Sequence, residues 1–339
     1  MTSAGKYAEL AAATRSFKAE LIRRDQIERL IEAGTLSETV SLLTVGKLTF
    51  SEGSEIGTVE SYLIERVIEV ANALSQYAPH DSRPLIKHIA KQYEYGCLKE
   101  VLRAIADQEA PEDAMRHLAP AGKFTFERCK ELIESRNPGR ALEELDDEGM
   151  KKTITSKLSG DKSGLGAVVT IDQYYYTKLW STSNLPDPLD AQSARGLVGQ
   201  FIDHLNILLA FRARLIGLDS RATADLLIPV NYALGHALTE LAEATNVASL
   251  MRIIEKTPYV RAFQGQSPVE GDVGIVELAL LRNHAKSCFD AFAGSPFNVG
   301  LALSLLFLKT YELRDLFSII NAKANSVPND HITDSLILF

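Results

Sequence analysis

The chain has 339 residues, of which 46% are hydrophobic and 24% are charged, so a large buried core and about two or three domains are expected. The formal net charge of −8 disfavours nucleic acid as a partner, because nucleic-acid-binding proteins present basic faces. The longest apolar stretch, 299–308, is too short to span a bilayer, and residues 1–6 lack the apolar run of a signal peptide, so we expect no transmembrane segment.

Helical periodicity dominates the chain. Apolar residues three or four positions apart predict amphipathic helices over 59–74, 85–105 and 194–218. Strand signals are weak, because the best run, 167–171, is a single short element that cannot build a sheet. Polar and glycine-rich stretches predict loops, which span residues 159–166, 181–188 and 264–271.

One helical motif recurs at a fixed period along the chain. Residues 94–120 align without a gap with 203–229, and the chain from residue 312 onwards aligns with both at the same spacing. The acidic column Glu94, Asp203 and Glu312 is the least expected by chance, because only 44 of 339 residues are acidic. A fixed period of this size indicates one supersecondary unit used several times. Apolar and small columns accompany the acidic one: Leu98, Ile207 and Leu316; Ala104, Ala213 and Ala322; and Leu118, Leu227 and Leu336.

The breaks between helices repeat with the same period. Each contains proline or short polar residues, which favour the start of a helix because they cap it or fix its first φ angle. The breaks lie at residues 110–112, 219–221 and 328–330.

The N-terminal region supplies the part of the third copy that the C-terminal region lacks. Leu30 aligns with Leu132 and Leu241, and prolines at 79, 188 and 296 open the successive units. We therefore predict an all-α fold in which three helical units, related by pseudo-threefold symmetry, form a closed funnel. The predicted units are 79–187, 188–295, and a unit split between 1–78 and 296–339 that both termini close.

The acidic column allows two interpretations. In one, Glu94, Asp203 and Glu312 line a central opening and meet a basic partner. In the other, each carboxylate faces solvent or pairs with a helix terminus in its own unit. The sequence favours the second interpretation but leaves the first open.

Several segments were weighed as chemical sites. In the glycine-rich segment 159–166, Asp161 stands where a phosphate-binding loop has glycine, and an acidic side chain there would repel phosphate. The seven histidines do not cluster, and His204 and His236 are expected to be hydrogen-bonded interior or surface groups. Tyr174, Tyr175, Tyr176 and Trp180 are expected to pack one unit on the next rather than to stack on bases.

Cysteine usage points to a reducing compartment. Cys97, Cys129 and Cys288 are scattered and odd in number, which does not fit a disulfide scaffold, and none has a flanking catalytic signature. We therefore predict no catalytic residue, no cofactor-binding residue and no metal ligand.

Distributed stretches resemble a known family. They read QFIDHLNILLAFRAR (200–214), LIP (227–229), EKTPY (255–259), PFNVG (296–300) and YELRDL (311–316). On these residues, and over nearly its whole length, the chain resembles the C subunit of archaeal-type rotary ATP synthases, equivalent to the d subunit of vacuolar-type ATPases. Three positions depart from that pattern: Thr310 replaces an acidic residue, Ser326 a glycine, and Asp315 a common asparagine.

The resemblance implies an all-helical funnel on the cytoplasmic face of a membrane, as a peripheral subunit of a rotary complex. Its implied partners are the membrane proteolipid ring and the central-stalk subunits. It would couple their rotation, in proton or sodium transport linked to ATP, and would itself be non-catalytic and bind no nucleotide.

Two other classes of function stay open at this point. The first is a helical adaptor that binds protein partners outside a rotary ATPase, although an open solenoid would not need a unit split between the termini. The second is a helical enzyme with a buried carboxylate site that uses Glu94 and Asp203.

Overall fold

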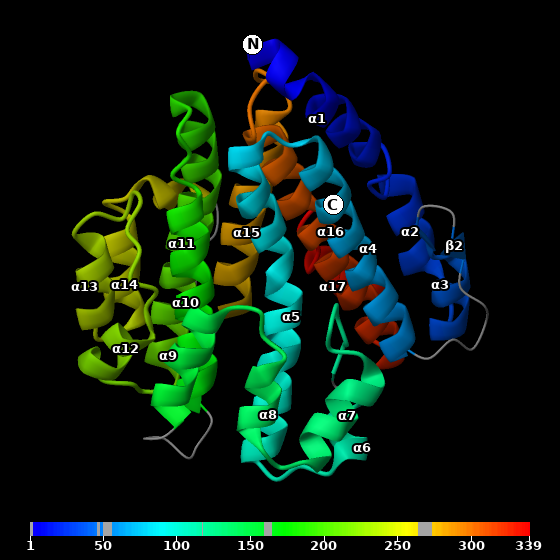
Figure 1. The fold of residues 1–339 in the computed structure, drawn as a ribbon, viewed down its shortest axis with the longest axis vertical. Helices are drawn as coiled ribbons and strands as arrows, with labels where there is room; N and C mark the ends of the chain where they lie inside the picture. The colour runs from blue at the N-terminus through cyan, green and yellow to red at the C-terminus, as the bar shows by residue number, and fades with distance from the viewer. Residues whose placement is uncertain (1–2, 46–47, 50–55, 117, 159–164, 264–272) are drawn as a thin grey trace.

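The computed structural model describes the chain except for residues 1–2, 46–47, 50–55, 117, 159–164 and 264–272 (Figure 1). The described residues are predominantly α-helical, which confirms the all-α prediction, and only β1 and β2 form a short antiparallel ladder. The first elements are α1 (Ser3–Lys18), α2 (Arg24–Glu32), α3 (Leu36–Leu42), β1 (Thr44–Val45), β2 (Leu48–Thr49), α4 (Ile56–Tyr77), η1 (His80–Ser82), α5 (Arg83–Ala106), α6 (Pro111–Ala114), α7 (Phe126–Glu134), α8 (Pro138–Glu143) and α9 (Glu148–Leu158). The remaining elements are α10 (Leu165–Thr182), α11 (Pro188–Leu215), α12 (Ser220–Leu226), α13 (Ala237–Glu243), α14 (Val247–Ile254), η2 (Pro258–Phe263), α15 (Val273–Ala291), α16 (Gly300–Ala324) and α17 (Asn329–Asp334).

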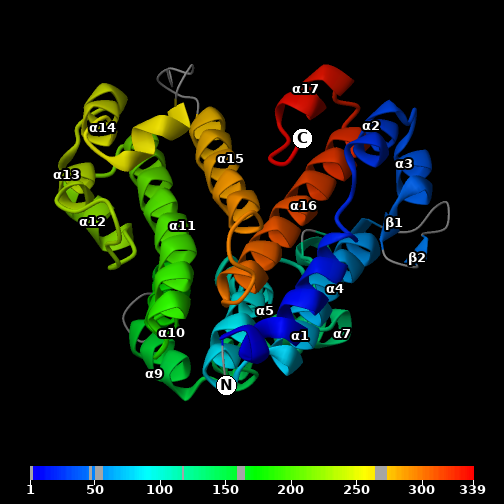
Figure 2. The ribbon, with the colours of Figure 1, turned by 90° about the horizontal axis from the view of Figure 1, so that it is seen from above.

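Six long helices form the frame of the molecule. Along the series α4, α5, α10, α11, α15 and α16, each helix contacts the next, and α16 also contacts α4, so the series of contacts is continuous. The short helices lie outside this frame: in Figure 2, α12–α14 lie beside α11, while α2, α3 and α17 lie beside one end of α16. The frame places α5, α11 and α16, which carry the repeated motif, next to one another.

These three helices end in the same way. The backbone turns left-handed at Gln108 (φ 54°), Gly217 (φ 73°) and Ser326 (φ 56°), which occupy one column of the repeat. The N–H of the following residue then bonds back to a carbonyl five positions earlier, an arrangement known as the Schellman motif. These bonds run from Glu109 to Ala104 (2.9 Å), from Leu218 to Ala213 (3.0 Å) and from Val327 to Ala322 (2.9 Å). The repeated alanines are therefore the carbonyl acceptors that close the three helices.

A second set of contacts recurs with the same period. In each copy a side chain on the long helix bonds to the backbone 22 positions later, which holds the segment after the short helix. The pairs are Cys97 Sγ with Ala119 O (2.9 Å), Asn206 Oδ1 with Ile228 N (2.8 Å), and Asp315 Oδ1 with Ile337 N (2.7 Å). The sequence repeat is thus also a repeat of contacts.

Neighbouring parts of the frame are joined by equivalent side chains. Gln173 on α10 donates to the carbonyls of Asp225 (2.8 Å) and Leu227 (2.9 Å). Arg282 on α15 donates to the carbonyls of Asp334 (3.0 Å) and Leu336 (2.7 Å), and all three of these positions lie one repeat period further along. Each long helix therefore holds the segment that follows the next short helix in the repeat.

The N-terminal helices pack against the C-terminal ones (Figure 1). The Lys309 ammonium on α16 donates to the carbonyl of Glu20 (3.2 Å), and the Lys323 ammonium donates to that of Ala33 (2.7 Å). Phe339 and α2 line a common hollow. The two ends of the chain thus contribute to one group of helices, while the exact boundaries of the three predicted units stay a prediction.

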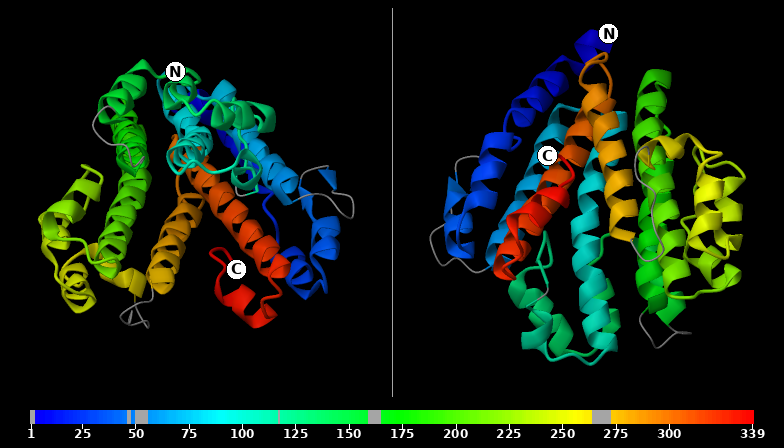
Figure 3. Two further views of the ribbon diagram at one scale, coloured as in Figure 1. Left: turned by 90° about the horizontal axis from the view of Figure 1, so that it is seen from below. Right: turned by 180° about the vertical axis from the view of Figure 1, so that it is seen from behind.

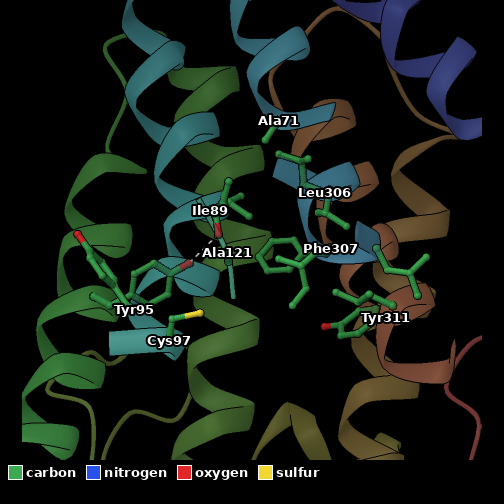
Figure 4. Packing of buried hydrophobic residues seen from close by; sticks show 14 of the residues in the cluster. Ala71, Ile89, Tyr95, Cys97, Ala121, Leu306, Phe307 and Tyr311 are labelled. Carbon is green, nitrogen blue, oxygen red and sulfur yellow. Dashed lines mark hydrogen bonds between the residues drawn. The ribbon is translucent and has the colours of Figure 1, made fainter. Parts of the chain in front are cut away.

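α16 lies at the centre of the hydrophobic core. Residues 301–309 are all buried, so the longest apolar stretch of the sequence is an internal helix. Figure 4 shows Leu306 and Phe307 pointing from α16 toward Ala71 and Ile89. Across the described part of the chain, no helix combines the length and the apolar character that a membrane span requires.

The local predictions had mixed outcomes. The weak strand signal at 167–171 was wrong, because this run lies in α10, where Ala167 and Ile171 are buried against other helices and packing overrides β propensity. The loop at 181–188 is confirmed only for residues 183–187, since α10 ends at Thr182 and α11 begins at Pro188. The loop at 264–271 and most of that at 159–166 lie outside the described residues.

Candidate functional site

The six long helices together line a central cavity of about 350 Å³. Its wall is largely aromatic and aliphatic, and every helix of the frame contributes to it. Representative lining residues are Ile64 of α4, Tyr93 of α5, Tyr176 of α10, Leu205 of α11, Leu281 of α15 and Phe317 of α16. A cavity to which all the repeated elements contribute is the natural place for a partner to contact all of them at once.

Charged side chains stand at the edge of this cavity in paired form. Lys99 and Asp172 form an ion pair of 2.7 Å between α5 and α10. Glu277 on α15 accepts from Arg212 (2.7 Å) and from Arg314 (2.5 Å). Burial alone would raise the pKa of Glu277, but the two guanidinium groups hold it below its usual value. Glu277 therefore stays ionised and ties α11, α15 and α16 together.

A second hollow of about 400 Å³ adjoins the cavity. It lies between α15, α16 and α17, and it shares Glu277, Leu281 and Arg314 with the central cavity. The ion pair of Glu277 with Arg314 thus separates two connected openings.

The acidic column does not line the cavity. The Asp203 carboxylate accepts from the N–H groups of residues 232–234, at 2.7–3.2 Å, and from the Tyr259 hydroxyl (2.6 Å). Glu312 accepts the N–H of Ile22 (2.5 Å). Glu94 lies against Gly122, where an added Cβ would sit 2.4 Å from its carboxylate oxygen. Each carboxylate therefore contacts the segment just before the next short helix, as the second interpretation predicted.

The aromatic residues pack as the sequence indicated. Tyr176 on α10 contacts Phe201 on α11, with ring centroids 6.1 Å apart. Trp180 lies between the Arg195 guanidinium (3.8 Å from its ring centroid) and the Tyr232 ring (6.1 Å). Both contacts join the predicted unit 79–187 to the predicted unit 188–295.

The histidine prediction was only partly right. His236 is exposed, but His204 is buried and neither of its ring nitrogens has a hydrogen-bond partner, which sequence reasoning did not foresee. His284 instead bonds to the Tyr311 hydroxyl (2.6 Å) and to the carbonyl of Leu197 (2.9 Å). Burial lowers the pKa of His284 to about 4, so it is neutral at physiological pH.

A buried junction near the start of α11 was also missed. Asp190 accepts the N–H of Val299 (3.0 Å) at the start of α16, the Tyr7 hydroxyl of α1, and an ion pair from Lys6 (3.5 Å). Because these partners are more than one hundred positions away along the chain, no local pattern announces the contact. Proline at 188, which places Asp190 in the first helical turn, was the only signal available.

The candidates for chemistry show no assembled reaction site. Burial raises the pKa of the Cys97, Cys129 and Cys288 thiols, so none is a thiolate at neutral pH. Among the described residues, no three His, Cys, Asp or Glu side chains gather in a way that could hold a metal ion. Most of the glycine-rich segment 159–166 lies outside those residues. The absence of catalytic, cofactor and metal sites therefore stays a prediction.

Comparison with known proteins decides the family. Residues 10–335 match the family described as ATP synthase (C/AC39) subunit. The chain belongs to this family. The match includes all three copies of the repeated helical motif and the six helices that line the central cavity.

Relatives of this family member match it over nearly its whole length. It is 24% identical to the C subunit of the A-type ATP synthase of Methanocaldococcus jannaschii, with 98% of this chain and 86% of the relative covered. It is 22% identical to the protein of the same name from Methanococcoides burtonii, with 99% and 95% covered. It is also 22% identical to that of Pyrococcus horikoshii, with 90% and 83% covered. The similarity is therefore low in identity but nearly complete in extent.

Proposed function

We propose that this chain is the C subunit of an A-type rotary ATP synthase. The observation that carries the proposal is the family match over residues 10–335, together with named relatives that the chain covers almost end to end. A helical adaptor outside such a complex is not favoured by these matches. As a part of this complex, the chain has a structural role and sits at the periphery of the membrane.

We further propose how this protein works. The repeated helices form a funnel of three units, 79–187, 188–295 and the split unit 1–78 with 296–339, and the central cavity receives the tip of the central stalk. The opposite side caps the proteolipid ring on the cytoplasmic face. Supporting observations are the continuous series of helix contacts and the cavity lined from all six long helices.

The rigidity of the frame supports a mechanical role. Tightly packed helices deform little, and three kinds of contact recur with the repeat period to fix the short helices on the frame. The carboxylates of Asp203 and Glu312, which an enzyme would need free, are already occupied by backbone and side-chain donors. The chain is thus proposed to transmit rotation without catalysing a reaction.

The test is binding of stalk and ring proteins to cavity variants. Leu205→Glu and Phe317→Glu each place a charge on the cavity wall, where both residues are only partly buried. Leu42→Glu makes the same kind of change at an exposed position of α3, outside the cavity. The cavity variants should lose co-purification with the stalk while keeping the ring, and Leu42→Glu should keep both. Equal stalk binding by all three variants would refute the assignment of the cavity.

A further inference from the structure

A second, polar hollow of about 470 Å³ lies on the outer face of the molecule, between α15 and η2. Seen from behind in Figure 3, α15 runs between α11 and α16. Charged and polar side chains make up most of the wall of the hollow, in contrast to the central cavity. Its lining residues on α15 include Arg282, Asn283, Lys286, Ser287 and Asp290, and η2 adds Arg261.

The wall is built on fixed supports. The residues of α15 that line it are spaced by three or four positions, so they share one face of the helix. The opposite wall, η2, is anchored because the Tyr259 hydroxyl donates to buried Asp203 (2.6 Å) and Phe263 is buried. The two walls therefore keep a constant separation.

The positive charge of the hollow is not compensated. Arg282 donates to the backbone carbonyls of Asp334 and Leu336, which position the guanidinium without neutralising it. Among the residues that the structure describes, no carboxylate lies within ion-pair distance of Arg261, Lys286 or Arg282. One acid, Asp290, also lines the hollow, so three cations face one anion.

Hydrogen-bond donors outnumber acceptors in the same place. Asn283 accepts from Gln200 (2.9 Å) through its oxygen, which leaves its amide nitrogen available as a donor. Arginine and lysine carry only donors, and charged donors form the strongest hydrogen bonds with phosphate-type oxygens. The volume of the hollow falls within the usual range of about 300–1,000 Å³ for small-ligand sites.

We propose that this hollow is a binding site for a small phosphate-type anion, with Arg261, Arg282 and Lys286 as its cationic contacts. The ligand class is a compact polyphosphate or a phosphorylated head group, because the hollow exceeds what one oxyanion requires. Asp290 limits the affinity. The site is separate from the central cavity and does not depend on the coupling function.

The test is calorimetric titration of the full chain with pyrophosphate near physiological ionic strength. Arg261→Gln with Lys286→Gln should weaken binding at least about tenfold, because two charge-assisted contacts are lost. Asp290→Asn should instead strengthen it, since the one opposing charge is removed. The matched control, Arg252→Gln with Lys256→Gln, removes the same net charge from the exposed surface of α14 and the residues after it. Circular dichroism verifies that each variant is folded.

The outcomes separate a site from general electrostatics. Equal weakening by the two double variants, or no saturable binding below about 10 mM pyrophosphate, would overturn the proposal. The source of the anion is distinguished by co-sedimentation with phosphatidylcholine vesicles that contain or lack phosphatidylglycerol. Vesicle binding that is lost only in the Arg261 and Lys286 double variant assigns the site to lipid head groups, whereas binding of pyrophosphate alone assigns it to a free anion.

Discussion

Replacing Asp315 with asparagine tests how the C-terminal segment is held against α16. Asp315 is 1% exposed and accepts the N–H groups of Ile337 (2.7 Å) and Leu338 (2.9 Å). Burial raises the pKa of Asp315 to about 6, although both donors favour the charged form. In the preceding copy of the repeat, Asn206 makes the corresponding contact with the N–H of Ile228 (2.8 Å).

The expected effect depends on pH. Because the pKa of Asp315 is higher in the folded chain (about 6) than its ordinary value of 3.8, the folded state binds the proton more tightly. The associated stability is fully present below pH 3.8 and is lost as the pH rises through 6. At about 1.36 kcal/mol per pKa unit, ionised Asp315 costs about 3 kcal/mol at neutral pH. Asparagine removes this cost but leaves one N–H without its acceptor, which costs about 1 kcal/mol at every pH.

The assay is urea unfolding of both proteins between pH 4 and 8, followed by circular dichroism. The free energy of unfolding of Asp315→Asn, relative to the original chain, should rise by about 3 kcal/mol from pH 4 to pH 8. Asp334→Asn is the matched control, because it makes the same atom exchange at an exposed position of the same segment. Parallel curves for Asp315→Asn and the original chain would refute the reasoning.

Three further outcomes are expected. Ser326→Gly should stabilise the chain by about 0.5–1 kcal/mol, or about 1 °C in melting temperature, because Ser326 has a φ of 56°, and Gly217→Ser should destabilise it similarly; thermal unfolding checks both. Gly199→Ala should cost about 1–3 kcal/mol and change the emission of the single tryptophan, because its Cβ would lie 2.4 Å from the Tyr232 ring. Stability should fall by up to about 3 kcal/mol as the pH drops from 6.5 to 4, because the pKa of buried His284 is lowered to about 4, and His284→Gln should flatten that slope in urea titrations.

Much of the frame was predictable because it repeats. The columns spaced by the repeat period predicted which helices are equivalent, and the structure shows why they exist. Ala104, Ala213 and Ala322 are the carbonyl acceptors that end the long helices, and this requires the same position in each copy. The acidic column was also informative, because each carboxylate must reach the same backbone segment. A repeated contact leaves a repeated residue, and a single sequence is enough to reveal it.

Contacts that occur once were not predictable. Glu277 meets Arg212 and Arg314 across 65 and 37 positions, and neither partner lies at helical spacing from it. His204 is buried without a partner in a helix that otherwise reads as amphipathic, so only the structure shows its environment. These residues depend on the relative placement of whole helices, which local periodicity does not encode.

Rotation can pass through this protein only if its parts do not slide past one another, so the contacts between predicted units matter most. Two of these contacts are equivalent: Gln173 and Arg282 each hold two carbonyls of the next unit. At the third seam, Glu65 on α4 accepts the N–H of Gly122 (2.5 Å). Long side chains that bind backbone rather than other side chains fix a whole segment at once. A socket with all three seams closed in this way deforms as one body, which is the property that the coupling role requires.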